Sequence, residues 1–409
     1  MWKLKIKNKF LWKEIAMGEI NNKKVNTIFI STLGFALGIR QMAMTMVMPF
    51  LSTYSKTLEH NTPILAGIAL GIFGLMQAIF QIPYGIWSDK KGNKIVMVVG
   101  LMQVILGLVI AYFANNIYLL IFARAMQGSG AIIAVGYSWI SSTVTDSKER
   151  MNSMSIIGTI VGAAAASSFA FGPLIHRFVS VKNMFLYSAI IILIAWLIII
   201  IFLKDSKNVT NENVVSSKEA IKILSKDKAF FALNIAALIN NFIMTGVFFA
   251  IPQYLENITG IDDMWKIFMP TVIIAIIIMR IAVKKLNNVS SIKFLILAFI
   301  VSSVGMLFYL NKNSFASLFI GTLLFMSGYI SIGTIIPSLG NFILRDEYRG
   351  TGNGIINSLQ YIGSFLGSLV ISAIWSKSEK LSFIIILIVG LLGGFLIKKY
   401  VDKERFNER

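Results

Sequence analysis

The sequence predicts an all-α integral membrane protein with twelve transmembrane helices in two pseudo-symmetric six-helix bundles and both termini in the cytoplasm. Three observations lead to this fold class: the composition, a series of long apolar runs, and the distribution of basic residues around those runs. Of the 409 residues, 56% are hydrophobic and 14% are charged, whereas an ordinary soluble domain carries about 25% charged residues. A water-soluble globule is therefore nearly excluded.

Twelve apolar runs of membrane-spanning length follow one another along the chain. They occupy residues 27–51, 64–87, 95–113, 117–141, 152–176, 183–203, 229–255, 265–283, 292–310, 315–344, 352–375 and 381–397. The third, fifth, sixth and twelfth runs are the clearest, and the eighth reaches spanning length only if it begins near Trp265. At about 20 residues per transmembrane helix, the runs leave room for little else.

The basic residues lie mainly on one side of these runs. If both termini share a side, that side holds 28 of the 38 Lys and Arg residues, and the opposite side holds 7. The other three, Arg40, Arg124 and Arg280, fall inside spans. Short basic loops resist translocation, so this split places both termini in the cytoplasm. The net charge of +19 then reflects topology and contact with lipid, and no nucleic-acid partner is expected.

A long polar stretch after the sixth span divides the chain into two halves. The predicted organisation is a basic cytoplasmic N-terminal segment (1–26), an N-terminal bundle (27–203), a cytoplasmic loop (204–228), a C-terminal bundle (229–397) and a basic cytoplasmic tail (398–409). Residues 1–25 lack the apolar core of a cleavable signal peptide, so the first span is the expected targeting signal.

The two halves also resemble each other. The residues VMPFLSTY around Pro49 match AIPQYLEN around Pro252 at an offset of 203, and the turns around Arg150 and Arg349 match at an offset of 199. Weak internal repeats of this kind are typical of secondary transporters, which rock two bundles about a central site. The sequence therefore predicts a protein that moves a small-molecule substrate across the lipid bilayer.

The composition argues against several other chemistries. The chain has no cysteine and only two histidines, so disulfides, thiolate nucleophiles and Cys- or His-based metal centres have almost no residues to use. No cluster of acids or histidines gathers at one membrane face, and no GxxxxGK[ST] phosphate loop is present. We therefore expect no enzyme activity, no metal site, no cofactor and no primary pump.

The turn between the second and third spans carries the most specific motif, GIWSDKKGNK. The motif residues are Gly85, Asp89, Lys90, Gly92 and Lys94. So short a turn between long helices favours glycine. A carboxylate in this turn can face helix N-termini or arginines at the cytoplasmic seam between the two halves.

Spans four and five carry two further motifs. Span four reads ARAMQGSGA, and its motif residues are Arg124, Gln127, Gly128 and Gly130. Span five carries a stripe of small residues that ends in Gly-Pro: Gly158, Gly162, Gly172 and Pro173. An arginine inside a span is usually paired, buried in protein or facing water, and small residues let helices approach closely.

These motifs resemble those of the major facilitator superfamily, in its drug/proton antiporter branch, and the first two spans resemble the YajR-type group of that branch. The superfamily resemblance covers essentially the whole chain. It implies a monomer in the cytoplasmic membrane of a bacterium, and a latch of the outward-open state between Asp89 and the start of span eleven. Asn93 departs from the arginine that the family usually has. The soluble C-terminal domain of some members of the group is not expected.

Proton coupling is implied by this resemblance alone, because none of the nineteen acidic residues lies in the middle of a span. The candidates for buried charge or coupling are Arg40, Arg124, His176 and Glu256. The ordinary pKa of histidine, about 6.5, suits proton transfer. Two buried arginines that face a cavity favour an anionic or zwitterionic substrate. The alternative is that both arginines bond carbonyls and polar side chains of neighbouring helices.

Superfamily cavities are lined mainly by spans one, four, seven and ten, and polar residues gather there, with two more in span eleven. The expected cavity-lining residues are Gln41, Gln127, Tyr137, Asn234, Asn241, Tyr329, Asn357 and Gln360. The expected function is export of small amphipathic molecules by alternating access, coupled to the proton gradient. The alternatives are a uniporter or symporter for an organic anion or zwitterion, and a membrane sensor that transports nothing.

Overall fold

The computed structural model describes residues 26–144, 146–205, 217–284, 286–311, 314–345 and 349–401. Most of the predicted N-terminal segment and tail, and part of the predicted 204–228 loop, lie outside the described residues. Twelve helices in the described part are long and apolar enough to cross a membrane. That part forms no strand, although Glu59 and Asn116 make an isolated bridge.

The helices follow the predicted order. The first span, Asn26–Ser55, includes η1 (Met48–Phe50) and α2 (Leu51–Ser55). The rest of the N-terminal bundle is α3 (Pro63–Lys91), α4 (Asn93–Phe113), α5 (Ile117–Ser129), α6 (Ile133–Thr143), α7 (Ser147–His176) and α8 (Val181–Phe202). After α9 (Ser217–Leu224), the C-terminal bundle is α10 (Lys228–Ile258), η2 (Ile261–Asp263), α11 (Trp265–Val283), α12 (Asn288–Phe308), α13 (Phe315–Ile343), α14 (Arg349–Trp375) and α15 (Glu379–Tyr400).

Several of these helices begin at a side chain that caps the first turn. Thr62 accepts a hydrogen bond from the Leu65 N–H at 3.2 Å, and Asn116 accepts one from the Leu119 N–H at 2.9 Å. Asp227 accepts from two N–H groups at the start of α10. The first N–H groups of a helix have no partner inside it, so these side chains fix where the helices start.

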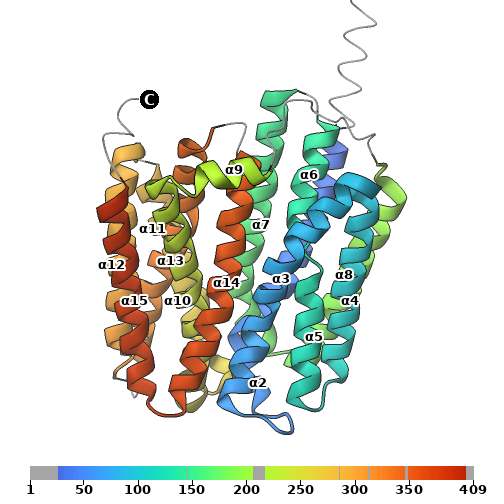
Figure 1. Ribbon diagram of the computed structural model, residues 1–409. Helices are drawn as coiled ribbons and strands as arrows, with labels where there is room; N and C mark the ends of the chain where they lie inside the picture. Colours follow the sequence, from blue (N-terminus) through green and yellow to red (C-terminus); the bar gives the residue numbers. More distant parts are fainter. Residues whose placement is uncertain are drawn as a thin grey trace, which may run out of the picture.

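The helices pack into two bundles that meet along two seams (Figure 1). Between the bundles, α3 packs along α14 and α7 packs along α11. The short helix α9 lies across one end of the molecule, and α2 lies at the other (Figure 1). We call these ends the α9 end and the α2 end. The predicted fold class of twelve helices in two bundles is confirmed; the side of the membrane on which the termini lie stays a prediction.

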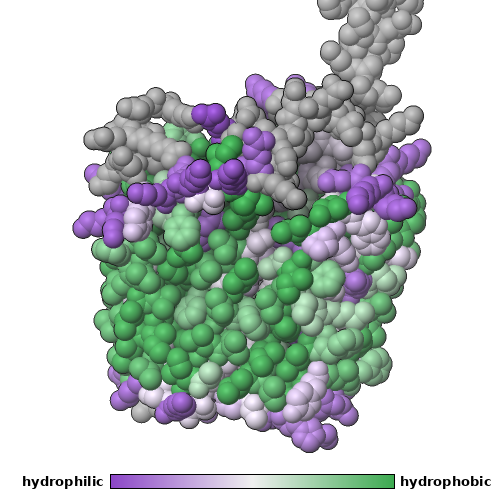
Figure 2. All heavy atoms as spheres, in the orientation of Figure 1, coloured by the Kyte–Doolittle hydropathy of each residue, from purple (hydrophilic) through white to green (hydrophobic). Residues whose placement is uncertain are grey.

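The surface carries an apolar belt between two polar ends (Figure 2). In the spanning helices α3, α4 and α8, Ile82, Phe113 and Ile201 expose 64%, 66% and 68% of their surface. Large apolar side chains exposed this far are rare on soluble proteins, and they gather here over a contiguous band. The belt is therefore the surface that contacts the hydrocarbon of a bilayer.

The seam between α3 and α14 is tight toward the α2 end and loose toward the α9 end. A Cβ atom built on Gly67 would lie 2.0 Å from the Ser372 hydroxyl, and one on Gly71 would lie 2.1 Å from the Ser368 hydroxyl. Nearer the α9 end of the same helix, a Cβ atom on Gly85 would meet no described atom within 4 Å. Along this seam, the described parts of α3 and α14 therefore touch closely at Gly67 and Gly71 and not at Gly85.

The fourth span is not the single helix that the apolar run 117–141 predicts. It breaks between α5 and α6, where the residues are ARAMQGSGAI. At the break, a Cβ atom on Gly128 would lie 2.2 Å from the Phe73 carbonyl oxygen, and one on Gly130 would lie 2.5 Å from the Gly100 carbonyl oxygen. Hydropathy cannot show such a break, because its cause is the close approach of two neighbouring helices.

The tight part of the seam gives a first prediction, for Gly71→Val. The added side chain cannot fit against α14, and overpacking costs about 1–3 kcal/mol. Since about 1.4 kcal/mol is tenfold in an equilibrium, the variant should shift the protein toward a state that is open at the α2 end. The natural chain has no cysteine, so Gln253→Cys provides a single reporter there. We expect its labelling by a membrane-impermeant maleimide to be severalfold faster in Gly71→Val.

Gly85→Val is the matched control, since it adds the same side chain to the same helix where space is open. It should leave the labelling rate of the reporter unchanged or lower it. Equal acceleration by both variants would contradict the asymmetry of the seam.

Candidate functional site

Two arginines lie buried side by side in the N-terminal bundle. Arg40 in the first span and Arg124 in α5 are both 0% exposed. Both guanidinium groups lie over the ring of Phe73 in α3, at 5.4 Å and 5.0 Å from its centroid. A cation over an aromatic face is attracted by the ring quadrupole, so one ring contacts both charges.

Each arginine is held by one nitrogen. Nη2 of Arg40 donates to Gln77 Oε1 at 2.6 Å and to the Gly130 carbonyl, at the break in span four, at 3.3 Å. The same carbonyl accepts the Ile132 N–H at 2.9 Å. Nη1 of Arg124 donates to Gln127 Oε1 at 2.7 Å. These three partners belong to the N-terminal bundle, and Arg40 also interacts with the Tyr361 hydroxyl of α14 in the C-terminal bundle.

The other donors of this cluster have no protein partner. Among the described residues, Nε and Nη1 of Arg40, Nε and Nη2 of Arg124, and Nε2 of Gln77 lack an acceptor within hydrogen-bonding distance. Nor does any carboxylate in the described part form an ion pair with either arginine. Buried donors are almost always satisfied in folded proteins, so five unsatisfied donors at one place require a physical explanation.

Tyrosines from both bundles lie in the same region, Tyr137 in α6 and Tyr329 and Tyr361 in the C-terminal bundle. The Tyr361 hydroxyl in α14 lies beside the Arg40 guanidinium, and Tyr137 and Tyr329 lie near Tyr361. All three tyrosines are half-buried. We call Arg40, Arg124, Gln77, Phe73 and Tyr361 the arginine cluster. It crosses the interface between the two bundles.

Sequence reasoning identified Arg40, Arg124 and Gln127, but it missed Phe73 and Tyr361. Phe73 looks like one more apolar residue of a lipid-facing helix. Tyr361 follows the predicted Gln360, and the weak signal for it is its spacing from Ser364 and Ser368, which puts it on the face of α14 that meets α3.

An aromatic cluster closes the interface toward the α2 end. Phe169 of α7 stacks on Phe248 of α10 across the two bundles, with ring centroids 4.6 Å apart. Phe248 also stacks on Phe268, and Phe169 contacts Tyr329 edge-on. Aromatic pairs of this kind add about 0.5–1.5 kcal/mol each beyond burial of their area. They stabilise the closed half of the interface.

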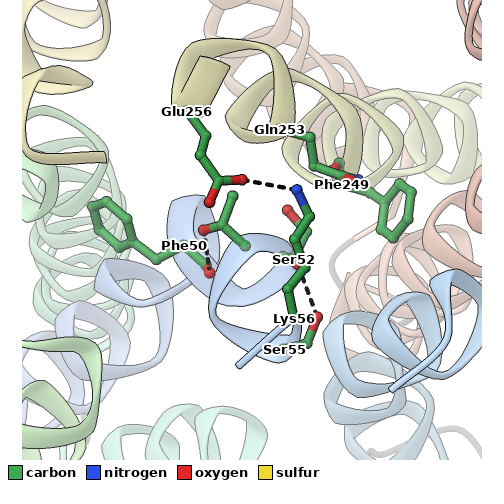
Figure 3. Close-up of polar contacts among 8 residues, drawn as sticks. Phe50, Ser52, Ser55, Lys56, Phe249, Gln253 and Glu256 are labelled. Carbon is green, nitrogen blue, oxygen red and sulfur yellow. Dashed lines mark hydrogen bonds and ion pairs between the residues drawn. The ribbon is translucent and has the colours of Figure 1, made fainter. Parts of the chain in front are cut away.

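An ion pair joins the bundles at the α2 end itself. Nζ of Lys56, which follows α2, lies 2.8 Å from Glu256 Oε2 in α10, and Figure 3 shows the two side chains pointing toward each other above Phe50 and Ser52. The partners are 200 residues apart, within one helical turn of the 203-residue offset between the halves. Equivalent ends of the two repeats therefore meet here. The predicted coupling residue Glu256 is one partner of an ion pair that joins the two bundles.

His176 lies at the same end, at the last turn of α7. Its ring packs on Phe50 with centroids 4.4 Å apart, and Nδ1 lies 3.1 Å from the Val179 carbonyl oxygen. Both predicted coupling candidates with titratable side chains are thus near the α2 end, and the arginine cluster is separate from them.

The turn after α3 is fastened to the N-terminal bundle. Lys94 Nζ donates to the Ile200 and Leu203 carbonyls at 2.8 Å and 2.6 Å, which binds the last turn of α8. Gly92 has a φ of +94°, and a Cβ atom there would lie 2.1 Å from Asp205 Oδ2. Glycine is required at this position on both counts.

Asp89 and Lys90 of the same motif are exposed. At the start of α14, Cβ atoms on Gly350 and Gly354 would meet no described atom within 4 Å. The latch between Asp89 and this part of α14 stays a prediction.

Other predicted cavity residues lie apart from the arginine cluster. Gln41, Asn234 and Asn241 donate within their own helices, at 3.0 Å, 2.8 Å and 3.2 Å. Asn357 and Gln360 are half-buried on α14. None of these five contacts Arg40 or Arg124 in the hydrogen bonds of the described residues.

The small residues of α7 do not all pack alike. Gly172 lies against the first span, with a carbonyl 2.9 Å from its Cβ position, and Pro173 next to it is buried. A Cβ atom on Gly158 would lie 3.3 Å from the Tyr137 hydroxyl, and one on Gly162 would meet nothing within 4 Å in the described part. Of these three glycines, only Gly172 is in close contact with the backbone of another described helix. The described residues also contain no group of three acids or histidines that could hold a metal ion.

The chain is similar to transporters along most of its length. The sequence profile of the Major Facilitator Superfamily matches residues 33–368. The inner membrane transport protein YajR of Escherichia coli is 29% identical over 348 residues, covering 82% of this chain and 74% of that protein. An uncharacterized transporter of Buchnera aphidicola is 28% identical over 360 residues, covering 86% and 89%. The quinolone resistance protein NorA of Staphylococcus aureus is 20% identical over 385 residues, covering 92% and 96%.

A solved structure has the same fold. A bacterial homologue of the human lysosomal transporter Spinster, in an inward-facing and unoccupied conformation, superposes with a TM-score of 0.73. It is 13% identical, and the match covers 94% of this chain and 98% of the other. The resemblance deduced from the motifs is confirmed by these matches.

The ion pair at the α2 end gives a second prediction. Exchanging the charge of one partner, in Lys56→Glu or Glu256→Lys, replaces attraction with repulsion and should open this end. Pairs that are partly exposed contribute about 0.2–1 kcal/mol, so we expect up to a fivefold rise in labelling of Gln253→Cys and a smaller rise at high salt. The double exchange should restore the slow rate.

Lys266→Glu is the control, because the Lys266–Asp263 pair joins neighbouring residues within one bundle. It should leave the labelling unchanged. An equal effect of this variant, or no rescue by the double exchange, would show that the Lys56–Glu256 contact does not hold the bundles together.

The turn after α3 gives a third prediction, in which Gly92→Ala is compared with Gly260→Ala. Both glycines have positive φ, +94° and +76°, but a Cβ atom on Gly260 would meet nothing within 4 Å in the described part. The backbone cost of about 1–3 kcal/mol is common to both, and only Gly92→Ala adds a clash with Asp205. Thermal denaturation in detergent should therefore show the larger loss for Gly92→Ala. Equal losses would mean that the contact with α8 is not a constraint.

Proposed function

Since the chain belongs to the Major Facilitator Superfamily, we propose that it is a secondary transporter that exports small amphipathic molecules by alternating access, in exchange for protons. The family consists of transporters and not of enzymes. The proposal concerns the finer points: the class of substrate, the direction, and the coupling ion.

One observation carries the proposal: a polar cluster is buried between two bundles whose interface is closed at the α2 end and loose at the α9 end. Alternating access requires a central site and an interface that closes at one end at a time. Gly67 and Gly71 pack against α14 on one side of the arginine cluster, and Gly85 has open space on the other. With the α9 end in the cytoplasm, as the basic residues predict, this state would receive its substrate from inside.

The opposite state would be reached by rocking one bundle on the other. The Lys56–Glu256 pair and the Phe169–Phe248 stack would separate, and the ends of α3 and α14 that carry Gly85 and Gly350 would come together. The loop with Asp89 lies at that end, where the family resemblance implies a latch. The N-terminal bundle would keep its hydrogen bonds to both arginines during the movement, because Gln77, Gly130 and Gln127 all lie within it.

Two features support an amphipathic substrate and its export. Phe73, Tyr329 and Tyr361 place aromatic surface beside fixed positive charge, which suits a molecule with an apolar body and a polar group. The similarity to the quinolone resistance protein NorA supports the outward direction.

Proton coupling is the part of the proposal with the least support from the site. No carboxylate in the described residues pairs with the arginine cluster. The remaining candidates are Glu256 and His176 near the α2 end. The unsatisfied donors of Arg40, Arg124 and Gln77 can bind an anion. They therefore also favour a second candidate function, a uniporter or symporter for an organic anion.

Uptake into everted membrane vesicles separates these functions. A panel of cationic, neutral and anionic amphiphiles is followed with an imposed pH gradient, with and without a protonophore, beside vesicles that lack the protein. For an exporter coupled to protons, we expect accumulation that follows the gradient, collapses with the protonophore and falls severalfold in Asp89→Asn. Glu256→Gln and His176→Gln would then locate the coupling group. Transport indifferent to the gradient would contradict antiport and indicate a facilitator.

A further inference from the structure

We propose that Arg40 and Arg124 form a binding site for the anionic group of an organic molecule, a carboxylate or a group of similar shape, whose aromatic body lies against Phe73 and Tyr361. That this anion is the transported molecule rests on the proposed function. Binding to the purified protein can be measured without any flux, so the two ideas can fail separately.

The free donors have the geometry that a carboxylate needs. In Arg124 the unsatisfied nitrogens are Nε and Nη2, which lie on one edge of the guanidinium. This edge binds a carboxylate through two parallel hydrogen bonds. In Arg40, the unsatisfied nitrogens are Nε and Nη1. The side-chain amide of Gln77 adds another unsatisfied donor, Nε2. Every unsatisfied group in the cluster is a hydrogen-bond donor. A ligand group that only accepts hydrogen bonds, such as a carboxylate, can therefore satisfy all of them.

The charge balance points in the same direction. Arg40 lies close enough to Arg124 for the two charges to repel each other, and both are completely buried. A buried charge is costly unless it is paired. No acid of the described residues pairs with them, so an anion from outside the chain is the group that neutralises the site.

The walls beside the charges suit an aromatic body. The ring of Phe73 lies within 5.4 Å of both guanidinium groups, and Tyr361 approaches Arg40 from the other bundle. The arginines are fully buried while Tyr361 is half-buried, so aromatic surface beside the charges is more accessible than the charges themselves.

The opposing explanation is that both arginines only hold helices together. The two explanations predict opposite effects of removing one arginine on the stability of the ligand-free protein. If the arginines are structural, removing one leaves Gln127 or Gln77 without its partner and destabilises the protein. If they form a binding site, the unoccupied protein contains two repelling charges, and removing one should leave it at least as stable as the natural protein.

Three probes with one aromatic body and different charge test the proposal: 2-naphthoate, 2-naphthamide and 2-naphthylmethylammonium. The full chain is purified in detergent, and binding is followed by calorimetry and by thermal denaturation. We expect saturable binding and thermal stabilisation by 2-naphthoate, and at least tenfold weaker binding of the neutral and cationic probes. Equal effects of all three, or no binding of 2-naphthoate, would overturn the proposal.

Variants then assign the binding to the cluster. Arg124→Gln should weaken 2-naphthoate binding about tenfold or more, as expected for loss of a charge-assisted pair, and Arg124→Lys should weaken it less. Arg280→Gln, at an exposed arginine of α11, is the matched control and should bind like the natural protein. Unchanged binding in Arg124→Gln, or ligand-free protein that is clearly less stable, would overturn the assignment.

Chloride distinguishes an organic from an inorganic anion. Displacement of 2-naphthoate by low millimolar chloride would assign the site to an inorganic anion and overturn the organic class; competition only at far higher concentration supports it. If 2-naphthoate binds but the vesicles transport nothing, the proposed function fails and the site stands. If the vesicles transport only cations, equally well with Arg124→Gln, the function stands and the site fails.

Discussion

Two like charges, held side by side in the interior of a membrane protein and paired with no acid of the described residues, are the constraint on which the rest of this structure depends. Arg40 and Arg124 share the ring of Phe73, and each is anchored through a single nitrogen. A protein that needed them only for packing would satisfy the remaining donors. Leaving them unsatisfied costs stability, and such costs persist where a ligand makes use of them.

The distribution of contacts between the bundles complements this cluster. The partners that fix the two arginines come from the N-terminal bundle, whereas the C-terminal bundle adds Tyr361 from across the interface. Movement of one bundle over the other can therefore change access to the charges, and their contact with Tyr361, without disturbing the hydrogen bonds within the N-terminal bundle. The Lys56–Glu256 pair and the Phe169–Phe248 stack lie on one side of the cluster, where they close the interface in the described state.

Most of the fold was predictable from the sequence, because spanning length, hydropathy and the side preference of basic residues are properties of single segments. The site was predictable only in part. Arg40 and Arg124 stand out because arginine is expensive in a span, but Phe73 and Tyr361 look ordinary until two helices are brought together. The break in span four escaped for the same reason, since its cause is the contact of Gly128 and Gly130 with other helices.

The most direct measurement is of spin-label distances at both ends of the interface, in a chain whose natural sequence has no cysteine to remove. Labels at Lys91 and Gly350 report on the α9 end, and labels at Thr57 and Asn257 report on the α2 end. On addition of 2-naphthoate, we predict that the first distance shortens while the second lengthens, because an anion at the arginine cluster should change the balance between the two states. Distances that do not respond, or that change in the same sense at both ends, would contradict a central site with alternating access.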